Sequence, residues 1–142
     1  MAWTHYQFEI RGGPASALLD TQFAEDAPTR ELPNLSWFGV YCRLPPGGAF
    51  WDPKEQKKLD AIEDDLIQLC GALGNGWAVY VRRLDTPGIR EYYVYFGEGA
   101  ELEKVCPDLR ARYPKYRIEF ESYPDLQWTH YQSWLQESGF DS

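Results

Sequence analysis

The chain has 142 residues, of which 44% are hydrophobic and 25% charged, so it can form one domain with its own core and is too apolar to be disordered. Its net charge of −8 opposes nonspecific binding to nucleic acid or to an anionic membrane. No segment has the length of a membrane span, and the N-terminus lacks the basic start and apolar run of a signal peptide, so we expect a cytoplasmic protein.

The N-terminal part, residues 1–34, predicts a β-hairpin followed by a loop. Within residues 3–11, Tyr6, Phe8 and Ile10 alternate with polar residues, as in a half-buried strand. Gly12-Gly13 indicates a turn, after which residues 15–23 can return as a second strand. Residues 24–34 contain prolines among charged residues and indicate a loop.

Residues 35–44 predict a third strand, with Trp37 and Tyr41 on one face and Phe38 and Val40 on the other. Residues 45–48, which read Pro-Pro-Gly-Gly, end this strand. A helix should follow from Asp52 as N-cap, with Pro53 at its first position and Glu55 placed for a capping box. Its apolar residues recur at helical spacing: Leu59, Ile62, Leu66, Leu69, Cys70 and Leu73.

Residues 77–84 and 89–96 predict a second hairpin around Pro87-Gly88. If Thr86 pairs with Ile89, then Tyr80 lies opposite Tyr95 on one face of the sheet, and Val81 lies opposite Val94 on the other.

Residues 100–113 predict a second helix, which Pro107 should kink or restart. Residues 115–122 alternate as a strand, and Asp125 can cap a short last helix that carries Trp128 and Tyr131 on one stripe.

From residue 35 to 122 the expected order is strand, helix, strand, strand, helix, strand. This order predicts an α+β protein with a ferredoxin-like βαββαβ core, in which the sheet is antiparallel and both helices lie on one face. We therefore expect a single domain: an N-terminal hairpin and loop (1–34), the ferredoxin-like core (35–122), and a C-terminal helix and tail (123–142).

A set of residues in a recurring order runs through most of the chain. It comprises residues 61–66, Tyr80-Val81, Arg83, Gly88, residues 90–93, Tyr95, Tyr116-Arg117, Trp128, Tyr131 and Leu135. The set resembles the bacterial family called domain of unknown function 695, which is similar in architecture to the RraB-type regulators of ribonuclease E. The resemblance implies a ferredoxin-like fold and action by binding an enzyme, and it carries no catalytic residue. Arg82, where a small residue is usual, and Pro107 depart from the family pattern.

The sheet face away from the helices is the candidate interaction surface. Its expected residues are Trp37, Tyr41, Tyr80, Arg82, Tyr93 and Tyr95. Aromatic residues with arginine suit a protein partner, and they also suit stacking of single-stranded RNA bases, which the acidic charge disfavours. The ordinary alternative is that the N-terminal hairpin or the last helix covers this face.

The pentapeptide Trp-Thr-His-Tyr-Gln occurs twice, at residues 3–7 and 128–132, and holds both histidines of the chain, His5 and His130. A strand would separate Trp3 from Tyr6, whereas a helix would group Trp128 with Tyr131, so we do not expect an internal repeat. Neither the histidines nor the three widely spaced cysteines form a metal-ligand or catalytic motif, so we expect no metal, no cofactor and reduced thiols.

Two functional hypotheses remain open. The first is a noncatalytic protein-binding module that regulates or inhibits a partner protein. The second is a small-ligand binder or enzyme whose site lies between the sheet face and the terminal elements. Its candidate polar residues are Arg83, Arg90, Trp128 and His130, with Tyr93 beside them.

Overall fold

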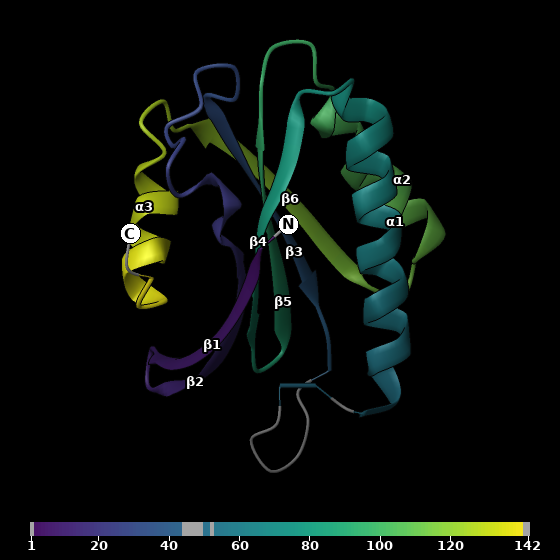
Figure 1. Ribbon diagram of the computed structural model, residues 1–142. Coiled ribbons are helices and arrows are strands. Elements are labelled where there is room, and N and C mark those ends of the chain that lie inside the picture. Colours follow the sequence, from purple (N-terminus) through teal and green to yellow (C-terminus); the bar gives the residue numbers. More distant parts are fainter. Residues whose placement is uncertain (1, 44–49, 52, 141–142) are drawn as a thin grey trace.

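The structure is a computed structural model in which residues 2–43, 50–51 and 53–140 are described. These residues form a six-stranded antiparallel sheet and three α-helices (Figure 1). The strands are β1 (Trp3–Ile10), β2 (Gly13–Asp20), β3 (Asn34–Tyr41), β4 (Ala78–Thr86), β5 (Ile89–Phe96) and β6 (Arg117–Pro124). The helices are α1 (Gln56–Gly74), α2 (Val105–Arg112) and α3 (Thr129–Glu137).

The strands lie in the order β1-β2-β4-β5-β3-β6. Figure 1 shows α1 and α2 on one side of the sheet, here called the helical face, and α3 on the other, here called the outer face. The N-terminal hairpin β1–β2 therefore does not lie over the sheet but extends it beyond β4.

The main core lies between the helical face and the two helices that cover it. The apolar stripe expected on α1 is buried there together with residues of α2 and of the central strands. Its members include Phe38, Ile62, Val94, Leu109 and Ile118, each at most 1% exposed. Alternate residues of the strands reach this core because successive side chains of a strand point to opposite faces.

A second core lies on the outer face, under α3. Trp128 stacks on Tyr95 with ring centroids 4.0 Å apart, and its indole Nε1 donates to the carbonyl oxygen of Leu32 over 2.8 Å. Tyr131 is also fully buried, and its hydroxyl donates to the carbonyl oxygen of Asp20 over 2.7 Å. The expectation that the last helix covers this face is confirmed for the part of the sheet around Tyr95.

The start of α3 depends on Asp125, as the sequence predicts. The two carboxylate oxygens of Asp125 accept from the backbone N–H groups of Thr129 (2.9 Å) and His130 (3.2 Å). These are two of the N–H groups that have no partner inside the helix. Asp125 therefore fixes where the helix begins and how it approaches the sheet.

The hairpin β4–β5 differs from the expected register along half its length. Thr86 pairs with Ile89 as predicted, but β4 has one extra residue between Tyr80 and Arg82. This β-bulge shifts the far half of β4, so that Val79 lies opposite Tyr95 and Tyr80 lies opposite Val94. The prediction that Tyr80 shares a face with Tyr95 is wrong, because the bulge turns Tyr80 toward the helical face.

The remaining boundaries agree with the sequence within a few residues. The helix α1 follows a 3₁₀ turn at Pro53–Glu55, whereas the expected cap Asp52 and residues 45–48 lie outside the described residues. Another 3₁₀ turn, Leu102–Lys104, precedes α2, and Pro107 lies in the first turn of that helix. The helix thus begins at Val105 with Pro107 in its first turn, as one of the two sequence-based alternatives expects.

Candidate functional site

The outer face is hollowed beside the C-terminal half of α3. This hollow, the outer groove, has a volume of about 730 Å³. The turns of both hairpins and the end of α3 surround it, and the outer face of the sheet forms its floor. The side chains on which its chemistry depends are Trp37, Tyr41, Arg82, Glu91, Tyr93, Trp134 and Glu137.

Trp37 and Glu91 line the outer groove from the neighbouring strands β3 and β5. The indole Nε1 of Trp37 donates to Glu91 Oε1 over 2.8 Å. The indole lies close over Gly39, where an added Cβ would be only 2.5 Å from the ring. A glycine at this position therefore lets the tryptophan lie on the sheet.

Burial raises the pKa of Glu91, and the hydrogen bond from Trp37 and the charges of Arg82 and Arg11 partly oppose this shift. The donor that the structure gives to this half-buried carboxylate is a neutral indole. A positively charged group entering the groove would supply the charge that the indole lacks.

Arg82 forms the wall of the groove beneath α3 and is 3% exposed. Its guanidinium lies 4.7 Å from the ring centroid of Trp134 and 5.5 Å from that of Tyr93. It is paired with Glu137 at 2.7 Å, and the hydroxyl of Tyr6 donates to the same carboxylate oxygen over 2.7 Å. Arg82 therefore serves to hold α3 and β1 together, and its charge is already balanced.

A smaller hollow of about 360 Å³ continues the outer groove toward β6. It shares Trp37, Tyr41 and Tyr93 with the groove and adds Glu119, Glu121 and Tyr123. Together the two hollows are lined by four carboxylates (Glu91, Glu119, Glu121, Glu137) and two guanidinium groups (Arg11, Arg82). Glu119 is paired with Arg117 at 2.8 Å and Glu137 with Arg82 at 2.7 Å, so the combined surface is aromatic with a small excess of negative charge.

The structure brings four of the six predicted surface residues together in the outer groove: Trp37, Tyr41, Arg82 and Tyr93. Tyr95 is fully buried under Trp128 and is a core residue, so its prediction as an exposed surface residue is wrong. Tyr80 lies on the helical face, for the reason given above. The sequence reading missed Trp134 and Glu137, although Trp134 stands three residues after Tyr131 and so on the same helical stripe.

The second predicted set does not form one site. Arg83 and Arg90 lie on the helical face, where Arg90 Nε binds Asp85 Oδ1 at 2.7 Å and Arg83 Nη1 binds Glu63 at 2.8 Å. Trp128 and His130 lie at the start of α3, on the opposite side of the sheet. The prediction of a joint polar site is therefore wrong, because the sheet separates its two halves.

The two histidines also lie on opposite faces. His5 Nε2 is 2.6 Å from the hydroxyl of Ser16, and His5 alternates along β1 with Tyr6, which reaches α3. His130 packs against Tyr123, with ring centroids 5.6 Å apart. Among the described residues, no group of three His, Cys, Asp or Glu could hold a metal ion.

Taken together, these features define a mixed α/β protein with a six-stranded antiparallel sheet among its described residues and an aromatic, acidic groove on the outer face. The chain belongs to the family of unknown function DUF695, which it matches over residues 1–136. This match confirms the family resemblance inferred from the sequence. No curated protein and no solved structure matches the chain. None of the described helices is long and apolar enough to cross a bilayer.

Proposed function

We propose that this protein is a noncatalytic binding module that docks a basic segment of a partner protein in the outer groove. The observation that carries the proposal is the half-buried Glu91 carboxylate among the rings of Trp37, Tyr41 and Tyr93. Arg117 and Arg82 already lie over the rings of Tyr41 and Tyr93, at 4.2 Å and 5.5 Å from their centroids. A lysine or arginine side chain of a partner would therefore gain its cation–π contact mainly from Trp37, together with an ion pair with the Glu91 carboxylate.

The charge of the whole molecule supports a basic partner. The net charge of −8 attracts a basic surface at long range and raises its rate of association. Within the groove, Glu137 already balances Arg82, so the excess charge that a partner meets is negative. The same excess disfavours single-stranded RNA, whose phosphates need cations.

We also propose that residues 34–124 form a ferredoxin-like core and that the protein works in the bacterial cytoplasm. The strand order β4-β5-β3-β6, with α1 and α2 crossing one face, supports the fold assignment. The free thiols of Cys42, Cys70 and Cys106 are consistent with a reducing compartment. Through this fold, the RraB-type regulators offer an analogy for a role as regulator or inhibitor of an enzyme.

The proposal is tested with two fluorescent hexapeptides, one alternating leucine with lysine and the other alternating leucine with glutamate. The lysine peptide should bind saturably and the glutamate peptide should not. Glu91→Gln keeps the shape and the acceptor for Trp37 but removes the charge, and should weaken binding of the lysine peptide about tenfold.

Glu98→Gln is the matched control, since Glu98 is an exposed residue outside the groove and the change in net charge is the same. The control should bind within about twofold of the unmodified protein. An equal loss of affinity in both variants would show a general effect of net charge, and it would reject the outer groove as the binding site. If the lysine peptide does not bind, the proposal that the partner segment is basic is rejected.

A further inference from the structure

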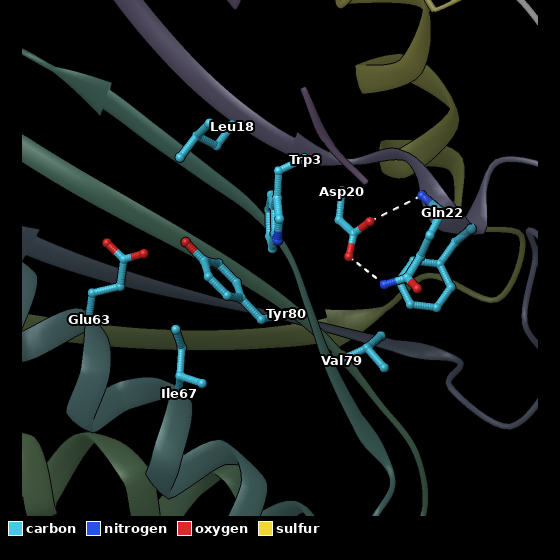
Figure 2. Close-up of a pocket in the computed structure, with 9 residues that line it drawn as sticks. Trp3, Leu18, Asp20, Gln22, Glu63, Ile67, Val79 and Tyr80 are labelled. Atoms are coloured by element: carbon cyan, nitrogen blue, oxygen red, sulfur yellow. Dashed lines mark hydrogen bonds between the residues drawn. The ribbon is translucent and has the colours of Figure 1, made fainter. Parts of the chain in front are cut away.

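A second cavity lies on the helical face, between α1 and the N-terminal hairpin. This cavity, the inner pocket, has a volume of about 490 Å³, within the range of small-molecule sites. Figure 2 shows Trp3 and Leu18 on the hairpin side, Glu63 and Ile67 on the α1 side, and Val79 and Tyr80 between them on β4. Its walls are therefore mainly aliphatic and aromatic.

The inner pocket follows from the way the hairpin extends the sheet. The helix α1 packs over β4, and the sheet continues past it through β2 and β1. Ile67 on α1 is 43% exposed, although it belongs to the side of the helix that faces the sheet, because it borders this opening. An opening of this kind leaves apolar surface that a ligand can cover.

One polar group in the pocket wall has no partner. The hydroxyl of Tyr80 is buried and makes no hydrogen bond within the described residues, and Figure 2 shows it directed between Leu18 and Glu63. Burial holds the pKa of Tyr80 well above its ordinary value, so the hydroxyl stays protonated and can donate. A buried donor without an acceptor carries a desolvation cost that a ligand acceptor would remove.

The other polar groups of the pocket are already engaged. Glu63 Oε1 accepts from Arg83 at 2.8 Å and from Arg90 at 3.4 Å. Asp20 accepts from the backbone N–H and the side-chain amide of Gln22. A ligand therefore meets satisfied carboxylates and one unsatisfied donor.

We propose that the inner pocket binds a flat, largely apolar small molecule with one hydrogen-bond acceptor, to which the Tyr80 hydroxyl donates. The rings of Trp3 and Tyr80 favour a flat ligand, and the single donor favours a neutral carbonyl or ether oxygen over a charged group. This site is independent of the outer groove, since the two lie on opposite faces of the sheet.

The test titrates the full chain with two probes of nearly equal shape, 2-acetylnaphthalene and 2-ethylnaphthalene, followed by two-dimensional ¹H–¹⁵N NMR. Both probes should shift the signals of Trp3, Leu18 and Ile67. The ketone should bind about five- to tenfold more tightly, because it alone offers an acceptor. Tyr80→Phe removes only the hydroxyl and should abolish this preference.

Ile67→Trp should fill the pocket and prevent binding of both probes, whereas Leu126→Trp, at a position 67% exposed and outside the pocket, should leave binding unchanged. Because Ile67 is partly exposed, Ile67→Trp should fold, and it still tests the location of the site if Tyr80→Phe does not fold. Three results would overturn the proposal: no saturable shift with either probe, an unchanged ketone preference in Tyr80→Phe, or shifts centred on Trp37 in the outer groove.

Discussion

At the scale of single residues, the outer groove depends on the contact between Trp37, Gly39 and Glu91. The glycine leaves room for the indole, and the indole N–H in turn fixes the carboxylate. The carboxylate is half-buried, so its charge is only partly solvated and costs the folded state free energy. In the proposed function, a cation of the partner would offset this cost by forming an ion pair with the carboxylate.

The pKa of Glu91 predicts how Glu91→Gln changes stability with pH. Because burial raises this pKa in the folded state, the folded protein binds the proton more tightly than the unfolded chain. The stabilisation from protonated Glu91 is present at low pH and is lost as the pH rises through the raised value. The Glu91→Gln variant lacks this loss, so its stability relative to the unmodified protein should increase as the pH rises from below the ordinary glutamate pKa through the raised value.

Urea unfolding across this pH range checks the prediction. Glu98→Gln, measured in parallel, corrects for the change in net charge. A relative stability of Glu91→Gln that is constant with pH, or that falls as the pH rises, would contradict a raised pKa.

Gly39→Ala should displace the indole of Trp37. The new Cβ would lie 2.5 Å from the ring, so the side chain has to leave its place on the sheet. We expect a loss of about 1–3 kcal/mol in the free energy of unfolding, as in other overpacked sites. Gly71→Ala is the control, since a Cβ there meets nothing within 4 Å and alanine favours the helix. Equal stability of the two variants would show that the indole moves without cost.

At the scale of elements, α3 is held to the sheet by a short chain of hydrogen bonds. The hydroxyl of Tyr95 donates to Asp125 over 2.6 Å and accepts from the backbone N–H of Tyr131 over 3.2 Å. Asp125 in turn caps the helix. The helix that bounds the outer groove is thus positioned by one buried tyrosine of β5.

Tyr95→Phe should loosen α3 without unfolding the rest of the protein. Loss of the hydroxyl leaves Asp125 and the Tyr131 N–H without this partner, which should cost about 1–3 kcal/mol. Amide hydrogen exchange should become faster in α3 and stay unchanged in α1. Tyr123→Phe is the control, since Tyr123 is partly exposed, and it should change neither the stability nor the exchange rates of α3 and α1. Equal acceleration in α1 and α3 would mean that the two helices open together.

The sequence predicted the order and type of the elements, because each has a clear apolar period and identifiable end signals. It could not predict the bulge in β4, because Val81 and Arg82 continue the alternation of residues without any turn signal. Of the outer groove, Trp37, Tyr41, Arg82 and Tyr93 could be found from alternation alone. The burial of Tyr95 could not be predicted in this way, since it depends on where α3 packs on the sheet. The inner pocket could not be predicted from the sequence, because it forms between elements that are far apart in the chain.

At the scale of the whole molecule, buried charges join the layers. Arg90 is fully buried on β5, binds Asp85 of β4 at 2.7 Å, and contacts Asp60 and Glu63 of α1 at 3.3 and 3.4 Å. Its guanidinium also lies 4.5 Å from the ring centroid of Trp51. One cation thus connects the hairpin β4–β5 to α1 and to the segment before it.

Arg90→Met should cost about 3–5 kcal/mol, because it leaves Asp85 buried without its closest cation. The double variant Arg90→Met with Asp85→Asn removes the stranded charge and should be more stable than the single variant. Urea unfolding of both single variants and of the double variant gives the coupling free energy. Additive losses would show that Asp85 does not depend on Arg90.

The extra residue in β4 has a consequence for how this fold can change during evolution. Removal of the single codon for Val81 would restore regular pairing, because Tyr80 already lies opposite Val94 and Arg82 opposite Tyr93, and it would leave Tyr80 on the helical face. Val81 lines neither cavity, so an in-frame deletion or insertion at this position could occur in a lineage while every residue that lines the two cavities keeps its face.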